Sequence, residues 1–140
     1  MSSTVLAAAQ AALAAEHAAV YGYGAVGGRV AASREAQARQ AYDAHRVARD
    51  ALIRTVTDLG GTPVAAAAAY ELPFAVSGPA AAVRLAAVLE DRVAGAYGDL
   101  VGAATGGVRR DAAAGLRAAA VRAVRWRGGS VAFPGLAERR

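Results

Sequence analysis

The sequence lacks cysteine, lysine and asparagine, and it has only one methionine and one tryptophan among 140 residues. The absence of cysteine excludes disulfide scaffolds, thiolate metal sites and cysteine nucleophiles. No uncharged stretch reaches the roughly 20 residues that a membrane-spanning helix needs, and the N-terminus lacks the basic segment of a signal peptide. We therefore expect a cytoplasmic protein that does not enter a membrane.

Alanine is the commonest residue and occupies 42 of the 140 positions. Alanine has the best helix propensity and a poor strand propensity, so this composition predicts an all-α fold. A chain of 140 residues is close to the usual size of one domain. We expect a single helical bundle domain over residues 1–140, with a short C-terminal tail from about residue 128.

Apolar periodicity and helix-breaking residues predict four helices, over residues 3–30, 34–59, 79–104 and 109–127. Ser33 is placed to cap the second helix, and Pro79 suits the first position of the third. The connection of about 18 residues before Gly78 is too long for a tight hairpin and predicts a crossover along the bundle. Residues 65–70 could form a short helical turn within it. The inner positions expected on the fourth helix are Leu116, Ala120, Val121 and Val124.

The first and third helices carry the same signature. Glu16 is followed after six residues by Tyr23-Gly24, and Glu90 is followed after six residues by Tyr97-Gly98. A spacing of seven places glutamate and tyrosine on one inward stripe of each helix. The second and fourth helices share a weaker pattern, Arg46-x-x-Arg49 and Arg122-x-x-Arg125. Together the two patterns indicate a duplicated helical hairpin with a pseudo-twofold axis.

Five segments carry a resemblance to a known family: AAEHAAVYGYGAVGGR, AHRVARDAL, ELPF, LEDRVAGAY and RAVRWRGG. In them the chain resembles an uncharacterised ferritin-like family of alanine-rich bacterial proteins, over nearly its whole length. The resemblance implies a ferritin-like four-helix bundle of two hairpins joined by a long crossover. In that fold the carboxylates of the first and third helices face each other, but the family implies no activity.

A ferritin-like di-iron site takes one Glu from each of two helices and a Glu-x-x-His pair from each of the other two. Glu16 and Glu90 match the lone glutamates, but the paired ligands do not follow. The second helix offers Asp43-x-x-Arg46, with His45 one position early, and the fourth offers Ala119-x-x-Arg122. We expect no metal and no cofactor. The alternative is a degenerate iron or manganese site formed by Glu16, Glu90 and His45.

A carboxylate on a core stripe must be neutralised, because an isolated buried charge is very costly. We expect Arg46 and Arg122 to supply guanidinium groups where metal ligands would stand. The open alternative places the glutamates at the edge of the stripe, in solvent.

His17 is expected at the hairpin edge or a subunit interface, and Trp126 is expected to anchor the tail. The predicted core polar network comprises Glu16, Tyr23, His45, Arg46, Glu90, Tyr97 and Arg122.

The positive charge is local, since residues 109–140 contain eight arginines and two acidic residues. These arginines do not share one helical face, so nucleic acid is disfavoured as a partner. No Ser/His/Asp ordering, P-loop or dinucleotide fingerprint occurs, and we expect no catalysis. Alanine-lined helices bury little apolar area, which favours a homodimer. We predict a non-enzymatic helical module whose protein or small-molecule partner the sequence does not name.

Overall fold

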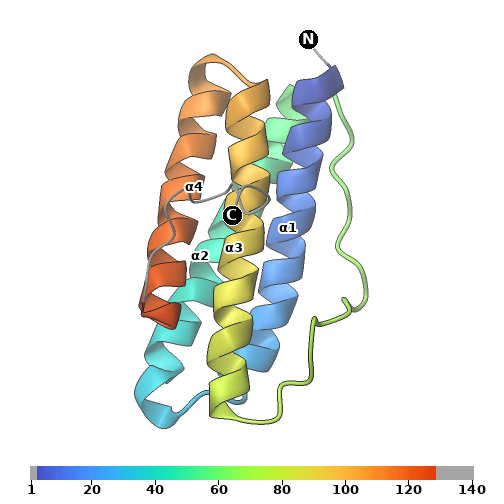
Figure 1. The fold of residues 1–140 in the computed structure, drawn as a ribbon. Coiled ribbons are helices and arrows are strands. Elements are labelled where there is room, and N and C mark those ends of the chain that lie inside the picture. The colour runs from blue at the N-terminus through green and yellow to red at the C-terminus, as the bar shows by residue number, and fades with distance from the viewer. Residues whose placement is uncertain (1–2, 129–140) are drawn as a thin grey trace.

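The computed structural model describes residues 3–128, and in this range it contains four α-helices, one short 3₁₀ helix and no strand. The prediction of an all-α, four-helix fold is confirmed. The expected tail lies outside the described residues from residue 129 onward. The elements are α1 (Ser3–Gly27), η1 (Ala32–Arg34), α2 (Glu35–Asp58), α3 (Pro79–Ala103) and α4 (Gly106–Arg127) (Figure 1).

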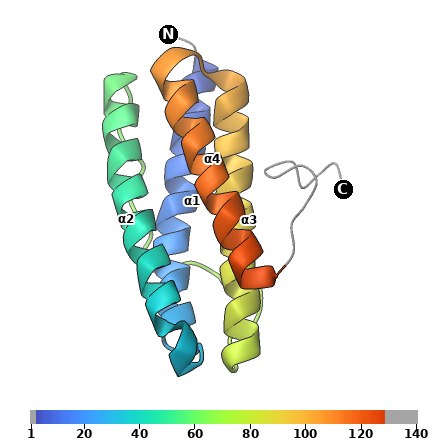
Figure 2. The same cartoon turned by 90° about the vertical axis from the view of Figure 1, so that its left-hand side faces the viewer.

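The four helices form two antiparallel hairpins, α1–α2 and α3–α4, which pack mainly through α1 and α3. Residues 59–78 contain no helix and run along the outside of the bundle from one end to the other (Figure 1). This crossover returns the chain to the end where α1 finishes, so α1 and α3 run antiparallel. By contrast, α2 and α4 contact each other little, and one side of the bundle is therefore open (Figure 2).

Side chains of α1 form hydrogen bonds with backbone groups of the crossover. Gln10 donates from Nε2 to the Thr62 carbonyl at 2.6 Å and accepts from the Val64 amide at 2.9 Å. His17 Nε2 donates to the Val64 carbonyl at 2.9 Å, and His17 is buried. The expectation of His17 at a hairpin edge or subunit interface is therefore wrong, because the crossover covers it.

Three local expectations are corrected. Ser33 does not cap α2: it lies inside η1, and the residue before α2 is Arg34, with no side-chain cap. Residues 65–70 form no helical turn. The last helix begins at Gly106, three residues before the expected start, and Gly106 has a φ of +59°, a left-handed conformation that glycine adopts readily.

The buried face of α4 differs from the predicted one. Its buried residues are Ala112, Ala119, Ala123 and Trp126, whereas Val121 is 49% exposed and Val124 is 37% exposed. Of the other two predicted inner residues, Leu116 is partly buried and packs against the apolar core, and Ala120 is partly buried. In a helix where alanine occurs all round, side-chain polarity gives little contrast, and small residues let α4 approach α3 closely.

The core consists of two apolar clusters, one towards each end of the bundle. The first contains Leu13, Val56 and Leu100, and the second contains Val26 and Leu85, all nearly inaccessible to solvent. Between them lies a layer of buried polar side chains. Within residues 3–128, no helix is both long enough and apolar enough to cross a membrane.

Candidate functional site

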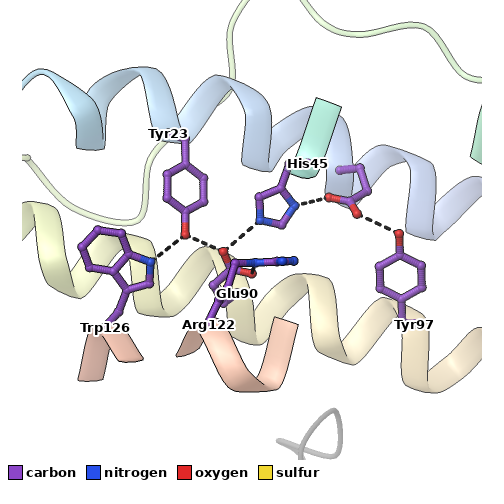
Figure 3. A network of polar contacts seen from close by, with 7 residues as sticks. Tyr23, His45, Glu90, Tyr97, Arg122 and Trp126 are labelled. Carbon is purple, nitrogen blue, oxygen red and sulfur yellow. Dashed lines mark hydrogen bonds and ion pairs between the residues drawn. The ribbon is translucent and has the colours of Figure 1, made fainter. Parts of the chain in front are cut away.

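The layer between the clusters is built from two glutamate–tyrosine pairs. Glu16 and Tyr23 are seven residues apart on α1, and Glu90 and Tyr97 are seven residues apart on α3. Because the helices are antiparallel, each tyrosine lies level with the glutamate of the other helix. Tyr97 donates to Glu16 Oε2 at 2.7 Å, and Tyr23 donates to Glu90 Oε2 (Figure 3).

His45 of α2 lies between the two carboxylates. Its Nδ1 is 2.5 Å from Glu16 Oε1, and its Nε2 is 2.8 Å from Glu90 Oε2. Glu16, His45 and Glu90 are each 0% exposed. One imidazole ring thus bridges the carboxylates of α1 and α3 (Figure 3).

This geometry defines the charge of the ring. An ionised carboxylate only accepts hydrogen bonds, so both nitrogens of His45 must donate, which makes the ring an imidazolium. Burial by itself lowers the pKa of His45. The hydrogen bonds to Glu16 and Glu90, with the charges of both carboxylates, outweigh burial and raise that pKa to about 9.

Glu90 has a second cationic partner, Arg122 of α4, whose Nε donates to Glu90 Oε1 at 3.0 Å. Burial raises the pKa of Glu90, but the hydrogen bond and charge of His45 and the charge of Arg122 hold it below its usual value. Two carboxylates therefore face two cations, and the layer is electrically neutral. Among the described residues, every buried side-chain nitrogen and oxygen has a hydrogen-bond partner.

The aromatic residues close the layer at both ends. Burial, with the neighbouring carboxylate charge, raises the pKa of Tyr23 and of Tyr97 far above the usual tyrosine value. Both hydroxyls therefore stay protonated and act as donors to the carboxylates. Trp126 of α4 donates from Nε1 to the Tyr23 hydroxyl at 2.9 Å.

The structure brings together six of the seven residues of the predicted network. The exception is Arg46, which is exposed and places its guanidinium carbon 5.6 Å from the centre of the Tyr42 ring. The expectation that Arg46 neutralises a glutamate is therefore wrong. Successive helical residues are rotated by about 100°, so the neighbour of an inward residue points away from the core. His45 is the cation that contacts Glu16.

Trp126 belongs to the layer, but the sequence interpretation gave it only the role of tail anchor. The signal that could have found it is its i, i+4 spacing from Arg122, which puts both side chains on one face of α4. Asp91 of α3 accepts a hydrogen bond of 2.5 Å from Arg127 Nη2 at the partly exposed edge of the bundle.

The candidate metal ligands Glu16, Glu90 and His45 do meet in the core. Within residues 3–128, however, no group of three acidic, histidine or cysteine side chains has an arrangement that could hold a metal ion. A protonated ring with both N–H groups engaged has no lone pair for a metal. Coordination here would require His45 to lose a proton and both carboxylates to leave it.

Cavities open on the side between α2 and α4. One, of about 190 Å³, is mainly apolar and reaches the Tyr97 ring and Leu100. Another, of about 220 Å³, is lined by Gln37, Gln40, Arg122, Arg125, Trp126 and two alanines. Arg122, with 21% of its side chain exposed, therefore reaches both the buried layer and this second cavity.

Four antiparallel helices around a buried layer of carboxylates, tyrosines, one histidine and one arginine define the structural class of this protein. The chain belongs to the family described as Domain of unknown function (DUF4439), whose model matches residues 8–138.

Among solved structures, the chain is similar to a conserved hypothetical protein, rv2844, from Mycobacterium tuberculosis. The two are 38% identical, with a TM-score of 0.88, over 91% of this chain and 98% of that one. A search of the curated proteins gave no match.

Proposed function

We propose that this protein is a non-enzymatic, ferritin-like helical bundle in which protein cations take the place of a di-metal centre. The observation that carries the proposal is the bridge of His45 between Glu16 and Glu90, from α2 to α1 and α3. In a ferritin-like bundle, carboxylates on facing helices are bridged by metal ions in the core. Here an imidazolium occupies that bridging position, and Arg122 supplies the second positive charge.

The state of the polar groups supports a structural role for the layer. A catalytic acid or base needs a proton-accepting or proton-donating atom within reach of a substrate. Glu16, His45 and Glu90 are inaccessible to solvent and are all hydrogen-bonded to one another or to Tyr23, Tyr97 and Arg122. Such a layer stabilises one packing of the four helices, and functional contacts would then be made by the outer surface.

The second candidate function is a degenerate metal site that uses Glu16, Glu90 and His45, with iron or manganese. It is favoured by one observation, the meeting of these three side chains in one buried cluster. Metal would have to displace a proton from His45, so its affinity would rise steeply with pH.

Elemental analysis separates the two candidates. The protein is purified without chelators, and iron(II) and manganese(II) are then titrated at neutral and alkaline pH. The proposal expects substoichiometric metal and no saturable binding that depends on His45. Stoichiometric metal that is lost in Glu16→Gln, but kept in the exposed control Arg46→Ala, would overturn the proposal and establish the alternative.

The proposal includes a homodimer in the cytoplasm. Exposed apolar side chains on two helices support association, since Val47 of α2 is 69% exposed and Val121 of α4 is 49% exposed. Light scattering at high micromolar concentration should give the mass of a dimer, and Val47→Ser with Val121→Ser should shift it towards the monomer. A monomeric mass for the unaltered protein would reject this part.

A further inference from the structure

The cavity of about 220 Å³ between α2 and α4 is lined by four polar side chains together with two alanines and one tryptophan. Its polar lining consists of two amide side chains, Gln37 and Gln40, and two guanidinium groups, Arg122 and Arg125, and Trp126 also lines it. Among the described residues, no acidic side chain lines it. This is a donor-rich surface, since guanidinium groups only donate hydrogen bonds.

Several donor groups of this cavity make no hydrogen bond within the described part of the chain. Arg122 bonds Glu90 through Nε alone, and within residues 3–128 no hydrogen bond or ion pair is made by its two Nη atoms. Arg125 and Gln40 likewise make none in that range. The fixed Nε contact presents the free edge of the Arg122 guanidinium in one orientation, which lowers the entropy lost on binding an anion.

A third cation lies beside the cavity. The guanidinium carbon of Arg34 lies 5.2 Å from the centre of the Trp126 ring, and Arg34 Nη1 donates to Gln37 Oε1 at 3.3 Å. The charge of Arg122 is balanced within the buried layer, whereas Arg34 and Arg125 make no ion pair within residues 3–128 and add positive charge at the rim. A phosphate monoester carries about −1.5 to −2 charges at neutral pH and three acceptor oxygens.

We propose that this cavity binds the phosphate group of a small phosphorylated ligand. Arg122 and Arg125 contact the phosphate oxygens, Gln37 and Gln40 donate from their amides, and Arg34 adds charge from the rim. A cavity of this size is below the roughly 300–1,000 Å³ of a pocket that encloses a whole drug-sized molecule. It therefore fits the phosphate, while the remainder of the ligand extends along the open side between α2 and α4. This inference goes beyond the proposed function and does not depend on the absence of a metal.

The single tryptophan provides the readout, because Trp126 lines the cavity and is the only tryptophan in the chain. The full-length protein is titrated with inorganic phosphate and with glycerol phosphate at constant ionic strength, and the fluorescence of Trp126 and the heat of binding are recorded. We expect saturable binding of one equivalent, with malonate, a dicarboxylate of similar charge, binding more weakly.

Variants locate the site. Arg125→Gln is expected to weaken phosphate binding about tenfold or more, because it removes a charge-assisted hydrogen bond. The matched control is Arg117→Gln, which removes the same charge from an exposed position of α4 that does not line the cavity. Arg125 is itself exposed, so the variant should keep its helical circular dichroism.

Three results would overturn the inference: titrations that do not saturate, an equal loss in Arg117→Gln and Arg125→Gln, or tighter binding of malonate than of phosphate. The first two would reduce the effect to general attraction by a basic helix. The third would assign the cavity to carboxylates. None of these results bears on the metal analysis, so the two proposals can fail separately.

Discussion

His45 is the residue on which the buried layer depends, because a single ring links three helices. A bridging imidazolium has two N–H groups on opposite sides of a small ring, and each meets one carboxylate oxygen. A neutral ring would carry one N–H only, and one carboxylate would then face a nitrogen lone pair at hydrogen-bond distance. The layer therefore requires the charged form of this histidine.

Nuclear magnetic resonance can test the charge of His45 directly. We expect both ring nitrogens to carry protons at neutral pH and the ring to titrate near pH 9, well above the ordinary histidine value of 6.5. His17→Gln assigns the signals, because the chain contains only two histidines. A neutral tautomer of His45 at pH 7 would contradict this description of the layer.

Arg122 and Arg46 provide a matched pair of arginine substitutions. Arg122→Ala removes one of the two cations that contact Glu90, and breaking a buried pair typically costs about 3–5 kcal/mol. Part of that cost should be relieved, since Arg122 keeps 21% of its side chain in solvent. We expect a loss of about 2–3 kcal/mol in the free energy of unfolding by urea. Arg46→Ala should change it by less than about 0.5 kcal/mol, as for exposed sites.

The double substitution Glu16→Gln with Glu90→Gln tests the charge balance of the layer by removing the negative charges instead of a cation. Uncharged amides need no cation, and His45 can then become neutral, so the double variant should lose less stability than Arg122→Ala. Urea unfolding of both proteins at pH 7 gives the comparison. If the double variant is the less stable of the two, the hydrogen-bond geometry of the carboxylates contributes more than their charge.

At the scale of the helix, α4 approaches α3 closely because small residues line its inner face. Gly115 is opposite the Tyr97 ring, and a Cβ atom at this position would lie only 2.8 Å from the ring carbons. Tyr97 cannot move away freely, since its hydroxyl is bonded to Glu16. The absence of a side chain at residue 115 thus sets the distance between α3 and α4 at the level of the polar layer.

Gly115→Ala should therefore destabilise the bundle, by about 1–3 kcal/mol as is typical of overpacking in a core. Gly24→Ala is the control, because a Cβ atom at residue 24 meets nothing within 4 Å. That substitution should stabilise α1 by about 0.5–1 kcal/mol through helix propensity alone. Thermal unfolding monitored by circular dichroism measures both. Equal effects of the two changes would show that the contact with Tyr97 does not determine the helix spacing.

For the whole molecule, the buried layer couples folding to pH. The pKa of His45 is about 9 in the folded protein, against 6.5 for an ordinary exposed histidine. Its contribution to stability is therefore fully present below about pH 6.5 and is lost as the pH rises through about 9. Glu90 acts in the opposite direction: its pKa is lowered, so its contribution is present above about pH 4.5 and is lost on acidification.

We accordingly expect a stability maximum between about pH 4.5 and pH 6.5, with a decline towards pH 9 of at most about 1.4 kcal/mol per pH unit for one titrating group. Urea unfolding across this range measures the slope. The variant with both Glu16→Gln and Glu90→Gln should show a much flatter profile on the alkaline side. A stability that is constant from pH 6.5 to pH 9 in the unaltered protein would contradict the assignment.

The amino-acid sequence by itself determined the helices and the inward glutamate–tyrosine pairs. Helix propensity, glycine pairs and Pro79 are local signals, and they placed α2 and α3 within about one residue of their bounds. The heptad spacing of Glu16 with Tyr23 and of Glu90 with Tyr97 depends only on helix geometry, so it identified four members of the layer. These properties follow from interactions within about two turns of one helix.

Only the tertiary structure decided which residues pair. The cross-pairing of tyrosines and glutamates results from the antiparallel packing of α1 and α3, and the selection of His45 over Arg46 results from the rotation of α2 about its axis. The sequence also did not determine the buried face of α4. Alanine occurs on every side of that helix, so the pattern of apolar residues does not identify the side that is buried. Long-range packing makes these choices.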